Sequence, residues 1–257
     1  MNALKSHIAI VAELWLAFWK RHRREPLSLA LTLLTAPVFV LVYSAVYGNA
    51  DEPSLQDFVP SLVIFAIIML IFSTAMAVAR EADRGTLARL RMTPMRPAHY
   101  LSAVAAFHLL LGIISVGLTF GVAMAVGFDS QGSVLVASLI AIVCALACIG
   151  IGIVVGSLAT SVYQAFLMAS FCMFLLLLFS GALFPLPDSE WITVFDRTIG
   201  WIDLLPTVHA VEAMSYVLLF GDSLLDVRGS VNMMIVLSVL YFVAGWSVFA
   251  TSRRNHL

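Results

Sequence analysis

The sequence predicts an all-α integral membrane protein, and composition, long uncharged runs and segregated charge lead to that class. Of the 257 residues, 61% are hydrophobic and 11% are charged, with a mean hydropathy of +1.01. One soluble core could not bury so much apolar surface. Uncharged runs of about 20 residues, the length of a membrane-spanning helix, recur along the chain. We expect six transmembrane helices in a single domain over residues 1–257.

Residues 1–25 are predicted to form a helix that lies in the membrane interface. Apolar side chains recur at helical spacing between Leu4 and Lys20, while the charged residues occupy other faces. A basic cluster over residues 20–24 then holds the start of the first span in the cytoplasm.

Two of the six spans are predicted from the absence of charge. No Asp, Glu, Lys, Arg or His occurs between Asp129 and Asp188, a length that demands two crossings, and the polar segment Ser157–Gln164 is the natural turn between them. In the fourth span, Gly152 and Gly156 are four residues apart, which favours close helix packing in lipid. The other spans are expected at about 27–48, 58–79, 100–126 and 231–250, and the fifth is expected to end near residues 180–181.

Residues 185–230 are predicted to form an external loop with re-entrant helices. The first part interleaves aromatic and acidic residues, a pattern typical of an amphipathic element at the outer interface. Pro206–Phe220 is apolar apart from His209 and Glu212 and is too short to span comfortably, so we expect a half-membrane helix buried in protein. His209 and Glu212 lie one turn apart, where their side chains can meet.

The distribution of basic residues predicts the orientation. Of the 14 Lys and Arg residues, all except Arg197 and Arg228 fall on one predicted side, and most acidic residues fall on the other. By the positive-inside rule the basic side is cytoplasmic, which places both termini inside the cell.

The charge-dense segment 80–97 lies between the second and third spans and is predicted to be a cytoplasmic loop. Its sequence, READRGTLARLRMTPMRP, resembles the signature loop of the ABC-2 family of ABC-transporter permeases, in which two carboxylates, a Gly-Thr pair and a proline stand at fixed offsets. A glycine here can end the preceding helix, and the threonine can cap a short new one. The resemblance implies a helix that couples the permease to an ATPase, carried by Glu81, Asp83, Gly85, Thr86, Leu87, Arg89, Leu90 and Pro94, whereas Ala88 and Arg91 depart from the pattern.

A second segment resembles the same family. Ser180-Gly181, Phe184-Pro185 and the run from Leu205 to Ala213 follow its pattern after the fifth span, although Leu205 and Ser215 replace a common asparagine and arginine. The resemblance covers essentially the whole chain. It implies a permease in the plasma or inner cell membrane that dimerises with an identical or related chain, docks cytoplasmic ABC ATPase subunits, contacts membrane lipid, and exports an amphipathic, drug-like or lipid- or saccharide-linked substrate by alternating access.

The resemblance further implies a substrate path lined by the second and fifth spans. Each candidate side chain could instead serve ordinary helix packing. His108, in the third span, is either a functional group or a neutral histidine bonded to a neighbouring helix. The candidates for the path are Met69, Ser73, Thr74, Met76, Phe166, Met168, Ser170, Phe174 and Ser180, and those for an outer gate are Phe184, Pro185, Pro206, His209 and Glu212.

The chain itself is not expected to be an enzyme. Neither lysine follows a glycine, so no phosphate-binding loop is present, and a partner subunit would bind ATP and Mg²⁺. We expect no cofactor, metal or nucleic acid on this chain. An intramembrane serine hydrolase that pairs Ser180 with His209 or His108 is the alternative. An ion-coupled secondary transporter would need buried carboxylates, which the predicted spans lack.

Overall fold

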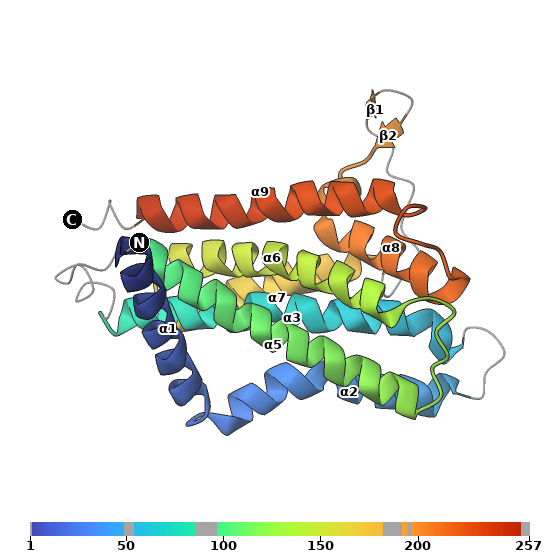
Figure 1. Cartoon of the computed structure of the whole chain (residues 1–257), viewed down its shortest axis with the longest axis horizontal. Coiled ribbons are helices and arrows are strands. Elements are labelled where there is room, and N and C mark those ends of the chain that lie inside the picture. The colour runs from blue at the N-terminus through green and yellow to red at the C-terminus, as the bar shows by residue number, and fades with distance from the viewer. Residues whose placement is uncertain (1, 49–53, 86–96, 182–191, 195–196, 253–257) are drawn as a thin grey trace.

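The computed structural model describes residues 2–48, 54–85, 97–181, 192–194 and 197–252, most of which are helical. The long helices run side by side in one bundle, and α1 lies across one end of it (Figure 1). The start of α1 and the end of α9 lie at that same end. The helices are α1 (Asn2–His22), α2 (Pro26–Tyr47), α3 (Leu55–Asp83), α5 (Pro97–Ala125), α6 (Val134–Leu158), α7 (Val162–Leu178), α8 (Pro206–Phe220) and α9 (Arg228–Ser252).

Within the described residues, five helices are long and apolar enough to cross a membrane. They lie at Pro26–Tyr47, Leu55–Asp83, Ala98–Ala125, Val134–Leu158 and Arg228–Thr251, close to the first, second, third, fourth and sixth predicted spans. The helix in place of the fifth span, α7, is apolar but has only 17 residues. The chain is therefore built as a multi-pass membrane protein, and the count of six spans stays a prediction.

The central helix is α3, which packs against α2, α5, α6, α7 and α8. Every residue from Val59 to Ile68 is buried, so this part of the helix is covered on all sides. A helix that is apolar all round is the expected core helix of a bundle. Because lipid tails are as apolar as leucine side chains, the bundle depends on close packing rather than on exclusion of water.

Glycines on α6 allow that close packing. A Cβ added at Gly152 would lie 2.7 Å from Cβ of Thr74 on α3, and one added at Gly156 would lie 2.6 Å from the carbonyl oxygen of Ala75. The close packing predicted for these two glycines is thus confirmed, and α3 is the partner. On another face of α6, Gly150 meets Gly245 of α9, where an added Cβ would lie 2.5 Å from the Gly150 oxygen.

The predicted N-terminal helix is present as α1, and part of its apolar face packs on α5. The rings of Trp15 and Phe18 lie 6.4 and 6.0 Å from the ring of Phe107, and Phe18 also lies 5.8 Å from Tyr100. These aromatic side chains therefore contact protein, and the position of α1 in the membrane interface stays a prediction.

The segment between α7 and α8, where an amphipathic element was expected, contains strands. A short antiparallel hairpin pairs β1 (Ile192–Val194) with β2 (Arg197–Ile199), and a 3₁₀ turn, η1 (Ile202–Leu204), follows. The strands are rich in Ile, Thr and Val, residues that favour extended backbone, and the sequence analysis gave that propensity too little weight.

The half-helix expected at Pro206–Phe220 is α8, with the same limits. Pro206 fits the first helical position because its missing N–H needs no partner there, and Gly221 ends the helix in the left-handed region at φ +75°. The backbone N–H of Gln131 donates to the Leu218 carbonyl at 2.9 Å and ties the loop before α6 to this helix. The depth of α8 in the membrane stays a prediction.

Candidate functional site

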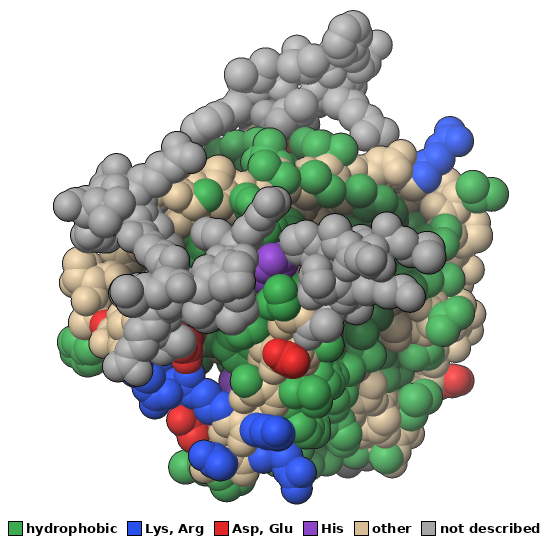
Figure 2. Space-filling view, turned by 60° about the vertical axis from the view of Figure 1, so that its left-hand side comes forward, with side chains coloured by type: hydrophobic (Ala, Val, Ile, Leu, Met, Phe, Trp, Pro, Cys, Tyr) green, Lys and Arg blue, Asp and Glu red, His purple; other side chains and the backbone are tan. Residues whose placement is uncertain are grey.

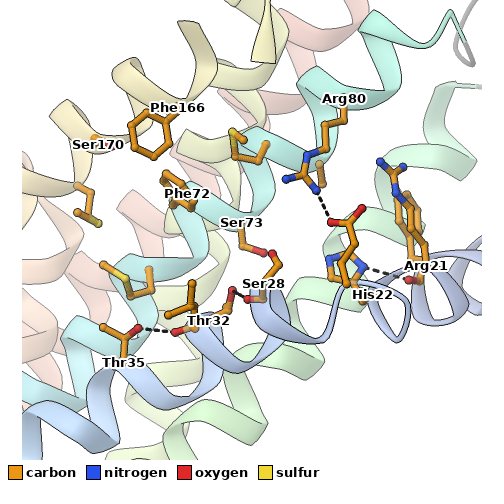
Figure 3. Close-up of a pocket in the computed structure, with 17 residues that line it drawn as sticks. Arg21, His22, Ser28, Thr32, Thr35, Phe72, Ser73, Arg80, Phe166 and Ser170 are labelled. Carbon is orange, nitrogen blue, oxygen red and sulfur yellow. Dashed lines mark hydrogen bonds and ion pairs between the residues drawn. The ribbon is translucent and has the colours of Figure 1, made fainter. Parts of the chain in front are cut away.

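A cavity of about 380 Å³ opens between α2, α3 and α7, near the turn from α1 into α2 (Figure 3). Most of its wall is apolar, and charged side chains gather at one end. The lining residues are Phe18, Arg21, His22, Glu25, Ser28, Leu31, Thr32, Thr35, Met69, Phe72, Ser73, Met76, Ala77, Arg80, Phe166, Ser170 and Met173.

Five of the nine path residues predicted from the sequence line this one cavity. They are Met69, Ser73 and Met76 on α3 and Phe166 and Ser170 on α7. The two walls also meet, because the ring of Phe166 lies edge-on to a neighbouring α3 ring, with centroids 5.1 Å apart. The structure thus brings together residues that are about 100 positions apart in the chain.

The other predicted path residues lie elsewhere. Thr74 is fully buried against Gly152 of α6, and Phe174 is 58% exposed on the outside of α7. Ser180 is buried just beyond α7, where its Oγ donates to the Leu177 carbonyl at 3.0 Å. Met168 is partly buried and packs against the core. Thr74 and Met168 therefore serve packing, Phe174 lies on an exposed apolar surface, and Ser180 lies at a helix end.

The wall contributed by α2 was not predicted from the sequence. Ser28, Thr32 and Thr35 all line the cavity, and the two threonine hydroxyl groups donate to carbonyl groups one turn earlier in α2. Hydroxyl groups bonded in this way are already satisfied within their own helix. Their recurrence at helical spacing in an otherwise apolar run was a signal that could have found them.

Two ion pairs form the charged end of the cavity. Nη1 of Arg80 donates to Oε2 of Glu25 at 2.7 Å, and Nη1 of Arg21 pairs with Oε1 of Glu81. Arg80 and Glu81 are consecutive in the last turn of α3, whereas their partners flank the turn between α1 and α2. Figure 2 shows Lys and Arg side chains gathered with Asp and Glu at this end of the molecule.

His22 lies at the same end in a neutral form. Its Nδ1–H donates to the Phe18 carbonyl at 3.0 Å. Burial lowers the pKa of His22, and the neighbouring Arg21 adds to that effect. The imidazole therefore adds no charge to the cavity at neutral pH.

The structure describes three of the residues assigned to coupling. Gly85, at φ +64°, ends α3 as predicted. Glu81 is only 8% exposed because of its pair with Arg21, and Oδ2 of Asp83 accepts a hydrogen bond from the Val162 backbone N–H at 3.2 Å. Both carboxylates thus join the end of α3 to other helices of the chain. The remaining coupling residues, Thr86, Leu87, Arg89, Leu90 and Pro94, lie outside the described residues.

A second cavity, of about 570 Å³, lies toward the other end of the bundle and holds two of the predicted gate residues. Nε2–H of His209 donates to the Asp203 carbonyl at 2.9 Å, and its Nδ1 lies 3.9 Å from Oε2 of Glu212. Glu212 in turn accepts a hydrogen bond from Ser230 of α9. Burial disfavours protonation of His209, but Glu212 and the Asp203 carbonyl outweigh it and raise the pKa above its usual value.

These contacts tie the start of α8 to its neighbours. Pro206 is the first residue of α8 and is buried, while Phe184 and Pro185 lie outside the described residues. His108 is fully buried, and its Nδ1–H donates to the Val104 carbonyl of its own helix at 2.8 Å.

The fold and the cavity define a class of protein: a multi-pass helical membrane protein with an amphipathic cavity inside the bundle. Residues 9–219 match the family described as "ABC-2 type transporter". Because the match covers most of the chain, this protein belongs to the ABC-2 type transporter family, and the resemblance seen in its loops is confirmed.

A more distant relative agrees with this assignment. The chain is 24% identical over 218 residues to ABC transporter G family member 20 of Dictyostelium discoideum. The match covers 83% of this chain but only 29% of that relative, so the chain spans less than a third of its length.

Proposed function

We propose that this chain is the permease subunit of an ATP-driven ABC exporter and that a separate subunit binds ATP and Mg²⁺. The cavity between α2, α3 and α7 carries the proposal, since it would form part of the translocation path. Its mixture of apolar and charged lining suits an amphipathic cargo, such as a drug-like or a lipid- or saccharide-linked molecule.

The contacts at the end of α3 supply a route for coupling. The predicted coupling loop, residues 80–97, begins in the last turn of α3, where Glu81 pairs with α1 and Asp83 accepts a hydrogen bond from the start of α7. A rigid-body push on that loop by an ATPase would thus reach α1, α3 and α7 together. All three helices contribute residues to the cavity.

Membrane placement follows from helix length and charge. We take α7 as the fifth span, because 17 residues rise about 25 Å and stand at the lower limit for a crossing. The basic cluster at the α1 end supports a cytoplasmic position for that end and for both termini. The exposed apolar faces of α2 and α7 are left to lipid and to a second permease chain, identical or related. The protein would act in the plasma or inner cell membrane.

The serine hydrolase is not favoured. Ser180 Oγ donates to a backbone carbonyl at the end of α7, and His209 and His108 donate to backbone carbonyls of Asp203 and Val104. The family match supports transport instead.

Co-purification with a candidate cytoplasmic ABC ATPase tests the proposal. We expect a stable complex whose ATP turnover in lipid nanodiscs changes when the permease is present. Leu87→Asp, in the predicted coupling loop, should abolish the complex, whereas Leu225→Asp provides the control because Leu225 is 76% exposed in the turn after α8. A chain that purifies alone and leaves turnover by every candidate ATPase unchanged would refute the proposed function.

A further inference from the structure

The cavity between α2, α3 and α7 is divided along its length into a charged and an apolar part. Figure 3 shows Arg21, His22 and Arg80 at one side, with Phe72 and Phe166 further along. The volume, about 380 Å³, falls in the range of small-molecule sites, about 300–1,000 Å³. A ligand that fills it would need a polar head and an apolar body.

The charged part offers more hydrogen-bond donors than acceptors. Two arginines line the described cavity, where Arg80 pairs with Glu25, while the carboxylate partner of Arg21, Glu81, is not among the lining residues. Nη2 of Arg21 is fully buried and finds no hydrogen-bond partner among the described residues, although Nη1 pairs with Glu81. A guanidinium group carries five N–H donors, and a buried donor without an acceptor is unfavourable. His22 adds no positive charge of its own, because burial lowers its pKa.

The pair between Arg80 and Glu25 can open to admit a ligand. Their side chains are 32% and 40% exposed, and ion pairs with that much contact with solvent contribute little to stability. An incoming phosphate or carboxylate can therefore replace Glu25 on Arg80. Such groups also match the planar fork of a guanidinium, which binds them through two parallel hydrogen bonds.

We propose that this cavity selects amphiphiles with an acidic headgroup, a phosphate or a carboxylate. The head binds Arg80 at the charged end, and the apolar tail lies along Phe72 and Phe166. This inference rests on the proposed function, because it names the substrate class of the proposed path.

Competition binding to the wild-type chain in nanodiscs tests the headgroup without an ATPase. The probe is a photoreactive dodecyl phosphate, whose cross-links are mapped on α3 and α7 by peptide mass spectrometry. Unlabelled dodecyl phosphate should compete about tenfold better than dodecyl maltoside or dodecyltrimethylammonium, which carry the same tail, a difference of one charge-assisted hydrogen bond. Equal competition by the three amphiphiles would overturn the headgroup preference. If inorganic phosphate competes as well as dodecyl phosphate, the cavity is a site for free anions, and the proposed selection of amphiphiles is wrong.

Two variants sharpen the test in opposite directions. Arg80→Gln should weaken the binding of dodecyl phosphate about tenfold and leave the binding of dodecyl maltoside unchanged. Glu25→Gln removes the carboxylate that competes for Arg80, so it should strengthen the binding of dodecyl phosphate. Arg228→Gln, far from this cavity, is the matched control. Weaker phosphate binding in Glu25→Gln would contradict the proposal. If the cavity does not prefer the phosphate headgroup but the complex with the ATPase forms, only this inference fails. If no complex forms, the proposed function is refuted, whatever the competition experiment shows.

Discussion

At the scale of single residues, the two ion pairs at the end of α3 have the same chemistry but different surroundings. Glu81 is nearly buried beside Arg21, whereas Glu25 and Arg80 remain partly exposed. An ionised group that loses its partner inside the protein keeps its desolvation cost, but one in contact with solvent is screened by water. Burial rather than charge therefore decides which pair holds the structure together.

This difference predicts unequal effects of two matched substitutions. Glu81→Gln should lower the free energy of unfolding by about 1–3 kcal/mol, because Arg21 stays buried without its counter-charge. Glu25→Gln should change it by no more than about 1 kcal/mol. Thermal unfolding of the two variants in detergent is the measurement, and each kcal/mol corresponds to roughly 2–4 °C in a chain of this size. Equal shifts would contradict the argument from burial.

The contacts of His209 predict a dependence of stability on pH. Its pKa in the folded protein lies above the value of about 6.5 expected in the unfolded chain. The stabilisation is therefore fully present below about pH 6.5 and is lost as the pH rises through the folded pKa. Asp203 and Glu212 face the imidazole directly, and Asp222, Asp226 and Arg228 line the same cavity.

Thermal unfolding of wild type and His209→Gln across this pH range tests that dependence. The unfolding temperatures of the two proteins should differ most at about pH 6 and become similar toward pH 8. In Glu212→Gln, the stabilisation by His209 should be lost at a lower pH, because the carboxylate that raises the pKa of His209 is gone. If the difference in unfolding temperature between wild type and His209→Gln increases with pH, the imidazole is not stabilised in its charged form.

At the scale of elements, α6 joins the bundle by meeting two helices through glycines on different faces. Gly152 and Gly156 allow α3 to approach, and Gly150 allows α9 to do so. Substituting one of these glycines should separate two helices instead of leaving a local defect. The core of α3, α6 and α9 should therefore be sensitive to single added methyl groups.

Gly152→Ala should destabilise the protein by about 1–3 kcal/mol, since the new methyl group would lie 2.7 Å from Cβ of Thr74 and 2.8 Å from the Ile71 carbonyl oxygen. Gly117→Ala on α5 is the control, because no atom lies within 4 Å of the added Cβ. Alanine favours the helix there by up to about 1 kcal/mol. Unfolding temperatures of the two variants should thus move in opposite directions, and a stabilised Gly152→Ala would contradict the packing argument.

The elements were more predictable from the sequence than their arrangement. Apolar runs and the flanking Pro206 and Gly221 gave α8 its limits, since those signals are local. The ion pairs at the cavity join residues 55 and 60 positions apart, and no local pattern specifies such a pairing. The same limit applies to Ser73, which lines the cavity, and to its immediate neighbour Thr74, which is buried against Gly152 of α6.

At the scale of the whole molecule, the cavity has one fixed and one loosely packed wall. The wall on α3 belongs to the core, whereas α2 buries only Ala36, Pro37 and Val40 and exposes most of its leucine side chains. Few buried contacts mean a low free energy for local movement. A cavity that must open and close would accordingly change shape through α2 and through the turn that carries Glu25.

Filling the cavity from its fixed wall should separate transport from assembly. Ser73→Trp places a large ring between α3 and α2, so it should remove substrate-stimulated ATP turnover while the complex with the ATPase and its basal turnover persist. The matched change Phe174→Trp adds a ring of the same kind on the exposed side of α7 and should leave stimulation unchanged. Turnover of both variants, measured in nanodiscs with the same ATPase, decides the matter. If Ser73→Trp is stimulated like wild type, the cavity is not on the path, and the exposed faces of α2 and α7 become the surfaces to examine.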